Sequence, residues 1–341
     1  MTASRVKLNP EPVAKADKHK DGGGLYFAKS SVTCIPTGSK LLDLVLGGGW
    51  AVGRIANVVG DKSTGKTLLA IEAIANFKHK FGDKAHVTYC EAESAFDKAY
   101  ANELGIPIDG VRMVEDCDTV EQFYNDLVKH CARAKESKTP SLYILDSLDA
   151  LSDEAETKRD MTEGTYGATK AKQMSQLFRR ATRILGESDT ALIIISQVRD
   201  KIGVTFGRKT TRSGGRALDF SATHIVYLSH LARLVKTVKG RKRVTGVKIK
   251  AMCEKNKLAV PFRECEFPIL FRYGIDDMKS CLEWLAEEEK VLEDKIGYKT
   301  VSAAYGKVVA DPSAQADVHK AVEEVWNEIE HGFTPTEKKY K

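Results

Sequence analysis

The sequence lacks any long apolar segment. No uninterrupted apolar run among its 341 residues approaches the roughly 18 residues that a membrane-spanning helix needs. The opening stretch, MTASRVKLNPEPVAKADKHK, also lacks the apolar core of a signal peptide. We therefore expect a cytoplasmic protein without a membrane partner.

Paired cysteine motifs are also missing. The seven cysteines are scattered along the chain, and no two of them have C-x-x-C spacing. An odd number of scattered cysteines argues against a disulfide framework, and the missing spacing argues against a zinc site. We expect reduced thiols at Cys34, Cys90, Cys117, Cys131, Cys253, Cys265 and Cys281.

The composition excludes a mostly disordered chain. Hydrophobic residues make up 42% of the sequence and charged residues 29%, with a mean hydropathy of -0.31. These values are typical of a globular protein that buries a core. The length is sufficient for one large α/β domain with a small appendage.

Acidic residues are absent from one basic stretch. The chain has 53 Lys and Arg against 47 Asp and Glu, and this small excess alone indicates no particular partner. From Arg199 to Arg216 six basic residues accompany one acid, and from Arg233 to Lys250 eight basic residues occur without any acid. Either the two stretches form one positive face that attracts phosphates, or the second is a solvated hairpin edge protected by its charges. The charge pattern leaves both interpretations open.

Short apolar runs alternate with amphipathic stretches between residues 31 and 275. RIANVV, HVTYC, SLYILD, ALIIIS and HIVYL predict strands, and LLAIEAIANFKHKF, TVEQFYNDLVKHCARA and KAKQMSQLFRRATRIL predict helices. The alternation predicts an α/β fold with a mostly parallel twisted sheet flanked by helices. We expect a flexible or oligomerising arm at residues 1–30 and a small C-terminal helical region at residues 276–341.

A phosphate-binding loop is predicted at residues 60–67. They read GDKSTGKT and match G-x-x-x-x-G-K-[ST] at every fixed position, between a predicted strand and a predicted helix. Glycines let the loop turn its N–H groups toward a phosphate, Lys66 is expected to reach the β and γ phosphates, and the Thr67 hydroxyl is expected to ligate Mg²⁺. A glycine-rich turn with an accidental match is the alternative. The predicted nucleotide-binding residues are Gly60, Asp61, Lys62, Ser63, Thr64, Gly65, Lys66 and Thr67.

Two predicted strands end in carboxylates. SLYILD ends in Asp146, and HVTYCEAE ends in Glu91 and Glu93. Ligands of open α/β sheets bind at the carboxyl ends of strands, so Asp146 is expected near the magnesium ion. One of the two glutamates is expected to act as the general base for water. A surface carboxylate is the alternative at each position.

Several segments resemble the RecA-type homologous recombinases, between residues 31 and 275. IPTGSKLLDLVLGGGWAVGRIANVVGDKSTGKT is similar to the family's entry segment and phosphate loop, and LYILDSLDAL is similar to its metal-binding strand. The most specific likeness is ALIIISQVRDKIGVTFGRKTTRSGGRALDF, which resembles the strand, switch glutamine and second DNA-binding loop of the family. The resemblance implies a RecA-like ATPase and DNA-binding core that uses ATP and Mg²⁺.

The same resemblance implies roles for particular side chains. EAESAFDKAY is similar to the segment that carries the catalytic glutamate and the tyrosine that stacks on adenine. CEKNKLAVPFRECEFPILF is similar to the segment whose two lysines reach the nucleotide of the neighbouring subunit. The implied catalytic residues are Lys66, Glu93, Gln197, Lys255 and Lys257. Tyr100 and Asp146 join the implied nucleotide site, and Thr67 and Asp146 form the implied metal site.

Two glycine-rich basic loops are the expected DNA contacts. The second loop follows Gln197, whose amide is expected to hydrogen-bond a γ-phosphate and so couple nucleotide state to loop order. A buried glutamine beside a disordered surface loop is the alternative. The first loop lies between Asp153 and Lys172, where Tyr166 either stacks on a base or packs within the loop. The predicted DNA-binding residues are Tyr166, Lys170, Lys172, Arg179, Arg199, Lys201, Ile202, Arg208, Lys209, Arg212, Gly214, Gly215 and Arg216.

These features predict an ATP-dependent recombination protein. We expect a helical filament of this chain on single-stranded DNA that catalyses homologous pairing and strand exchange with DNA-stimulated ATP hydrolysis. Double-stranded DNA is the second expected partner, and single-strand-binding and mediator proteins are further candidates. A short amino-terminal arm favours a phage-encoded branch of the family. A ring helicase with the same core and a noncatalytic ATP-binding accessory protein are the alternatives.

Overall fold

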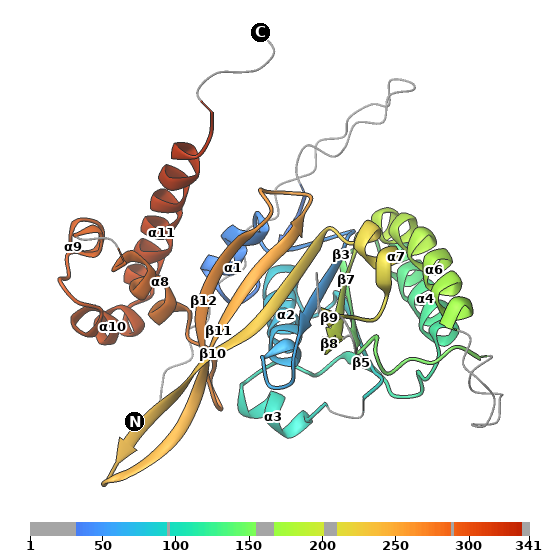
Figure 1. Ribbon diagram of the computed structural model, residues 1–341, viewed down its shortest axis with the longest axis horizontal. Helices are drawn as coiled ribbons and strands as arrows, with labels where there is room; N and C mark the ends of the chain where they lie inside the picture. Colours follow the sequence, from blue (N-terminus) through green and yellow to red (C-terminus); the bar gives the residue numbers. More distant parts are fainter. Residues whose placement is uncertain (1–31, 94–95, 155–166, 201–209, 288–289, 336–341) are drawn as a thin grey trace.

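The centre of the molecule is one large twisted sheet (Figure 1). The computed structural model describes residues 32–93, 96–154, 167–200, 210–287 and 290–335. In this part of the chain nine strands form the sheet, in the order β13-β12-β11-β10-β3-β7-β6-β4-β5. Its strands are β3 (Ile55–Gly60), β4 (His86–Glu91), β5 (Val111–Val114), β6 (Ser141–Asp146), β7 (Thr190–Gln197), β10 (His224–Val238), β11 (Arg241–Asn256), β12 (Arg263–Leu270) and β13 (Gly274–Ile275).

Parallel pairing runs through most of this sheet. The neighbouring strands from β10 through β3, β7, β6 and β4 to β5 are parallel, whereas β11, β12 and β13 continue the sheet with antiparallel pairing. The predicted α/β class with a mostly parallel sheet is therefore confirmed. Two minor pairs complete the described strands: β1 (Cys34–Ile35) with β2 (Trp50–Ala51), and β8 (Arg199–Asp200) with β9 (Thr210–Thr211).

Helices cover both faces of the parallel strands (Figure 1). One face buries apolar residues of α4, α6 and α7, and the opposite face buries those of α1 and α2, because each helix carries an apolar stripe toward the sheet. A short helix, α3, packs at the side of α2. The bounds are α1 (Lys40–Leu46), α2 (Lys66–Phe81), α3 (Lys98–Glu103), α4 (Val120–Ser137), α6 (Gly167–Ser188) and α7 (Gly215–Ser221).

The C-terminal helices form a separate group at the antiparallel side of the sheet (Figure 1). They are α8 (Asp277–Leu285), α9 (Val291–Ile296), α10 (Val301–Ala310) and α11 (Pro312–Gly332). Their buried side chains, such as Leu282 and Val322, belong to the same apolar cluster as α1 and α2. Arg263 of β12 also binds Glu330 of α11 through two contacts of 2.5 and 2.8 Å. The predicted boundary between the core and the C-terminal region at residue 275 stays a prediction. Residues on both sides of it belong to one buried apolar cluster.

The sequence patterns found the regular elements with a buried face. All five predicted strands and the three predicted core helices are present, with small shifts at their ends except for β10, which continues ten residues beyond the predicted HIVYL. The arm at residues 1–30 lies outside the described residues. No helix in the described segments has the length and apolar character that crossing a membrane requires. The seven cysteines are all described, and each is buried and forms no disulfide in the structure.

Two carboxyl groups are partly buried where the core meets the C-terminal helices. Asp43 accepts the N–H of Thr37 at 2.7 Å, and Glu72 accepts the N–H of Ile275 at 2.9 Å. Burial is the main cause that raises the pKa of each carboxyl to about 7. Each carboxyl therefore keeps its proton in the folded state at pH values where the unfolded chain has released it.

The raised pKa values predict that stability falls as the pH rises. The folded state binds more protons than the unfolded state between pH 4 and 7, so the stabilisation is present below about pH 4 and is lost through pH 7. We expect the Glu72 carboxyl alone to lower the free energy of unfolding by on the order of 2 kcal/mol between pH 5 and 8. Urea unfolding of wild type and Glu72→Gln at both pH values measures this. A difference as large in the variant would contradict the assignment.

Candidate nucleotide and DNA site

The predicted phosphate loop joins β3 directly to α2. Every residue of β3 is buried, and α2 begins at Lys66 after Gly65, which has a φ of 83°. A Cβ atom on Gly60 would lie 2.5 Å from Thr64 Oγ1, and one on Gly65 would lie 2.4 Å from a side-chain carbon of Ile269. At residue 60 a Cβ would also lie 3.0 Å from the backbone oxygen of Leu228, so close approach favours glycine there, and at residue 65 the positive φ favours it. The loop therefore has the strand-to-helix context that anion binding requires.

Polar side chains that suit a nucleotide and its metal lie at the loop. The Thr67 hydroxyl donates to Asp146 Oδ2 at 2.9 Å, and the Tyr89 hydroxyl donates to the same oxygen at 2.6 Å. Lys66 Nζ donates to the carbonyl of Asp61 at 2.7 Å. Burial raises the pKa of Asp146 and lowers the pKa of Lys66. Hydroxyl and carboxylate oxygens are hard ligands, so Thr67 and Asp146 fit Mg²⁺.

Strand register explains why these residues meet. Gly60 of β3 pairs with Gln197 of β7, and Glu91 of β4 pairs with Asp146 of β6. Because the strands are parallel, their carboxyl ends lie at one edge of the sheet. The phosphate loop, the two glutamates and the glutamine therefore share one site.

Glu93 is the glutamate that contacts the predicted switch residue. Gln197 Nε2 donates to Glu93 Oε1 at 2.8 Å, and the hydroxyl of Ser147 donates to the same oxygen. Glu91 is buried, with only 6% of its surface exposed, and its Oε1 accepts the N–H of Glu93 at 3.1 Å. The two glutamates thus differ in placement: Glu91 supports the backbone, and Glu93 reaches toward Gln197.

Tyr100 lies on α3 and is only partly buried. An ion pair of 3.3 Å between Arg272 and Glu103 brings the turn after β12 next to this helix. The same turn carries Phe271 and Tyr273, which are 51% and 59% exposed. The sequence pattern predicted no role for these two aromatic residues, although the segment FRYG, which holds them, is a visible signal for an aromatic turn.

Lys255 and Lys257 lie together at the end of β11. The ammonium groups donate to the carbonyl of Phe220 at 3.0 and 2.9 Å, and Lys255 also donates to the carbonyl of Asp219. Burial lowers the pKa of Lys255 to about 8, and the Lys257 charge adds to this effect. Within one chain, the two lysines therefore bind the C-terminal end of α7 and not the phosphate loop of the same subunit.

Among the described residues, the predicted DNA-binding side chains differ in their exposure to water. Lys172 and Arg179 are exposed on α6, and Arg216 is exposed at the start of α7. Arg212 differs from the exposed position expected of a DNA contact, because its side chain is only 7% exposed and binds Asn57 and Asp219. Gly214 and Gly215 begin α7, Lys170 lies on α6 and Arg199 lies on β8. Tyr166, Lys201, Ile202, Arg208 and Lys209 lie outside the described residues.

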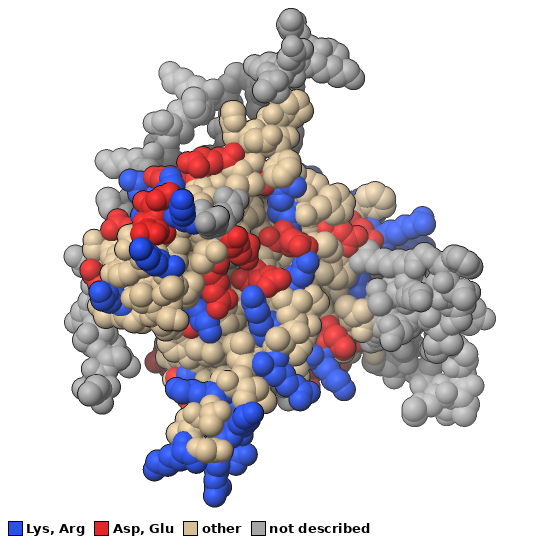
Figure 2. Space-filling view, turned by 60° about the vertical axis from the view of Figure 1, so that its left-hand side comes forward, with Lys and Arg blue, Asp and Glu red and all other residues tan. Residues whose placement is uncertain are grey.

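The second basic stretch forms a hairpin arm, which we define as residues 229–245. Strand β10 pairs with β3 only up to Leu228, and β11 pairs with β12 only from Gly246, so within the described residues the arm pairs with itself. Its six basic side chains are all exposed, and Figure 2 shows them gathered on a projection at the bottom of the view. They are Arg233, Lys236, Lys239, Arg241, Lys242 and Arg243.

The structure confirms that the second basic stretch forms a hairpin, and the role of its charges stays a prediction. In Figure 1 the outer end of the arm lies far from β8 and β9, which frame the second loop. Among the described residues, the two basic stretches therefore do not form one continuous face. The single face stays a prediction, because Lys201, Arg208 and Lys209 of the first stretch lie outside the described residues, while β10 carries the second stretch outward beyond the sheet.

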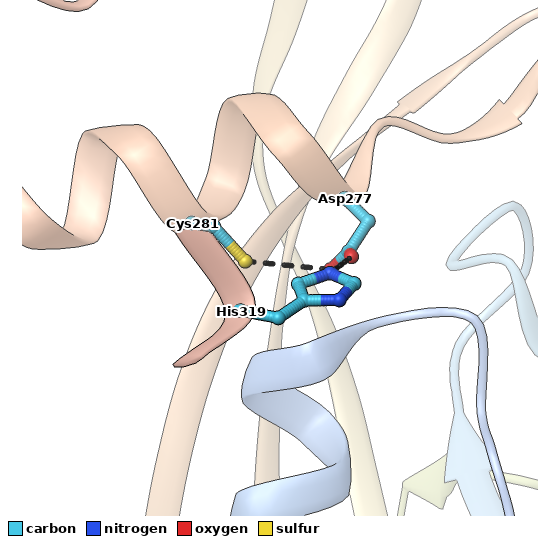
Figure 3. Close-up of side chains that lie close together, drawn as sticks. All are labelled: Asp277, Cys281 and His319. Carbon is cyan, nitrogen blue, oxygen red and sulfur yellow. Dashed lines mark hydrogen bonds and ion pairs between the residues drawn. The ribbon is translucent and has the colours of Figure 1, made fainter. Parts of the chain in front are cut away.

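A second cluster of polar side chains lies between α8 and α11. Asp277, Cys281 and His319 place ligand-type atoms within 4.8 Å of one another (Figure 3). His319 Nε2 lies 2.6 Å from one Asp277 oxygen, and the N–H of Lys40 donates to the other at 2.7 Å. Burial raises the pKa of the Cys281 thiol well above its usual value. These contacts satisfy the carboxylate and keep the thiol neutral, so the cluster joins α8 and α11 to α1 without needing an ion.

The sheet order and the edge that gathers the phosphate loop, Glu93, Asp146 and Gln197 define a RecA-like α/β core. Residues 23–276 match the family model described as the RecA N-terminal domain. The protein named Protein RecA from Thermus thermophilus is 41% identical over 249 residues, which are 73% of this chain and 70% of that protein. Protein RecA from Prochlorococcus marinus is 37% identical over 268 residues, which are 79% and 67% of the two chains.

The chain belongs to the RecA family. The predicted resemblance to RecA-type recombinases is therefore confirmed. The match ends one residue after the end of β13, so the C-terminal helices lie beyond the part that the family model covers.

Proposed function

We propose that this chain is an ATP-dependent recombinase that binds single-stranded DNA and pairs it with homologous duplex. The observation that carries the proposal is the hydrogen bond between Gln197 and Glu93. It joins the carboxyl end of one strand, where the second DNA loop begins, to the glutamate beside the phosphate loop. A triphosphate that attracts the Gln197 amide would break this bond and shift the start of the loop.

The residues at the phosphate loop fit ATP with Mg²⁺. Bound Mg²⁺ would supply positive charge that neutralises the phosphate oxygens. Thr67 and Asp146 would hold the ion, and the loop N–H groups and Lys66 would bind the phosphates. Glu93 would orient and deprotonate the attacking water, and Tyr100 would stack on the adenine. Both of these last roles rest on the resemblance together with the side-chain placement given above.

Exposed apolar residues near the two lysines support assembly of several copies. Phe220 is 76% exposed, Phe262 is 65% exposed and Val260 is 51% exposed. Where such exposed apolar side chains form a contiguous patch, they commonly mark a protein contact. A head-to-tail contact that does not close gives a helical filament, and it would bring Lys255 and Lys257 to the ATP of the next subunit.

Two alternatives remain as competing functions. A ring helicase would also carry the phosphate loop and basic loops, and electron microscopy with ATP and single-stranded DNA distinguishes its closed rings from an open filament. A noncatalytic accessory protein would bind ATP without pairing DNA. A D-loop assay with the purified chain alone separates that protein from a recombinase, because only the recombinase makes joint molecules unaided.

Two substitutions test the assignment of ATP hydrolysis. Lys66→Ala should abolish both nucleotide binding and DNA-stimulated hydrolysis, because it removes the charge that holds the phosphates. Glu93→Gln should lower hydrolysis by about 100-fold or more while ATP binding remains, because only the proton acceptor is lost. Phosphate release and binding of a fluorescent ATP analogue measure the two properties. Normal turnover of the Glu93 variant would remove this residue from the catalytic role.

The hairpin arm offers a site for the duplex partner. A two-stranded ribbon fits the major groove of B-DNA, and closely spaced cations are stabilised by phosphates. Replacing Lys239, Arg241, Lys242 and Arg243 with Gln should weaken duplex binding and reduce the salt slope of log affinity by about 0.9 for each lost phosphate contact. Fluorescence anisotropy over a salt series measures both.

Lys250→Gln is the matched control for the hairpin variant. Lys250 lies at the base of the arm, and its ammonium already pairs with Glu264 at 2.7 Å. We expect this control to keep the wild-type salt slope. If the fourfold variant also keeps wild-type duplex affinity and slope, the arm is a solvated edge and not a DNA site.

A further inference from the structure

One carboxylate contacts both ends of the second DNA loop. Asp149 Oδ2 accepts the backbone N–H of Gln197 at 2.7 Å, where the loop begins. Asp149 Oδ1 accepts the hydroxyl of Ser213 at 2.7 Å, where the loop ends. The two contacts fix the separation of the loop ends at the edge of the sheet that carries the phosphate site.

Arg212 reaches from the end of the same loop into the centre of the sheet. Its guanidinium donates to Asn57 Oδ1 on one side and to Asp219 Oδ1 of α7 on the other. Asn57 is fully buried in β3, and its Nδ2 donates to the Ile194 carbonyl at 3.0 Å and to Ser196 Oγ at 2.8 Å, both in β7. The arginine is therefore hydrogen-bonded to the strand that leads into the phosphate loop and, through one amide, to the strand that ends at Gln197.

The surroundings of Arg212 argue against a role as a phosphate ligand. Its side chain is 7% exposed, whereas Arg216, four residues later, is exposed. A buried guanidinium that leaves Asn57 would abandon a fully buried polar partner, which is costly, although Asp219 is exposed to water. A basic residue that binds DNA through released counterions is expected on the surface, as Arg216 is.

We propose that Arg212 and Asp149 are positioning residues that fasten the closing end of the second DNA loop to the nucleotide-sensing edge of the sheet. Arg212 holds this end to Asn57, which lies in the buried middle of the sheet and cannot shift without disturbing its neighbours. Gln197 is exposed at the end of its strand, so its side-chain amide can turn from Glu93 toward a phosphate while its backbone N–H stays bound to Asp149. Because Asp149 also holds Ser213, a shift at Gln197 is passed to the end of the loop that Arg212 holds to the sheet.

The same network reaches the lysines expected at the subunit contact. Asp219 holds Arg212 with its side chain, and its backbone carbonyl accepts a hydrogen bond from Lys255. Helix α7 therefore has the fixed end of the loop bound at one point and Lys255 and Lys257 bound at its C-terminal end. If Lys255 or Lys257 turned toward the nucleotide of a neighbouring subunit, it would leave α7. Assembly of subunits would therefore also alter the helix that holds Arg212.

The inference rests on the proposed ATP-dependent DNA binding, and one experiment tests it. A labelled oligothymidylate is titrated with the full chain and Mg²⁺, with either a nonhydrolysable ATP analogue or ADP, over a salt series. For Arg212→Ala, we expect the ratio of the two affinities to fall by about tenfold or more, toward one. The salt slope with the analogue should stay at the wild-type value, since no phosphate contact is lost.

Two further variants make the result decisive. Ser213→Ala removes only the hydroxyl that contacts Asp149, so it should fold normally and should also lower the affinity ratio. Arg216→Ala is the matched control at an exposed arginine: it should weaken binding equally with both nucleotides and make the salt slope shallower by about 0.7.

The outcomes separate this inference from the proposed function. If Arg212→Ala behaves like the Arg216 control, Arg212 is a phosphate ligand and the inference is overturned. If Ser213→Ala and Arg212→Ala both keep the wild-type ratio, the inference is also overturned, while ATP-dependent binding stands. If Arg212→Ala does not fold, as judged by circular dichroism, the Ser213 variant decides alone. Equal affinity of the wild type with both nucleotides would instead contradict the proposed function itself.

Discussion

Parallel pairing of β3, β7, β6 and β4 is the constraint on which the site depends. It brings four strand ends to one edge of the sheet, so residues far apart in the chain meet there. Glu93 and Gln197 are 104 positions apart, and Arg212 and Asn57 are 155 apart, yet each pair is hydrogen-bonded. A change in register along these strands would separate the phosphate loop from both the carboxylates and the second DNA loop.

The charged side chains at this edge of the sheet suit a ligand that carries both negative and positive charge. Burial disfavours the ionised forms of Asp146 and Lys66, and it raises the pKa of the carboxyl and lowers that of the ammonium. A phosphate group with its metal ion supplies an anion for Lys66 and a cation for Asp146, so both side chains would gain a partner at once. This complementarity is the physical reason for expecting nucleotide and metal to bind together.

Sequence patterns predicted the core well because its strands are buried on both faces and its helices on one. An apolar run such as ALIIIS is typical of a strand that is buried on both faces of a parallel sheet. The segment GDKSTGKT predicts a phosphate loop from its local sequence alone, because its glycines permit the backbone angles of the loop. No strand was predicted for the outer half of β10, for β11 or for β12. The outer ribbon of β10 and β11 has both faces in water, so it shows no apolar alternation to detect. The partners of Arg212 were missed for a different reason. Charge and position predicted a surface contact, but only tertiary structure brings Asn57 and Asp219 to its guanidinium.

The central claim is that a triphosphate, sensed at the end of β7, reorganises the base of the second DNA loop. Amide hydrogen exchange of the segment from Thr210 to Ser221 tests this most directly, with the full chain and Mg²⁺ but no DNA. We predict slower exchange in this segment with a nonhydrolysable ATP analogue than with ADP, because the repositioned Gln197 and its Asp149 contact order the loop base. Identical exchange with the two nucleotides, at concentrations that saturate the phosphate loop, would contradict the account.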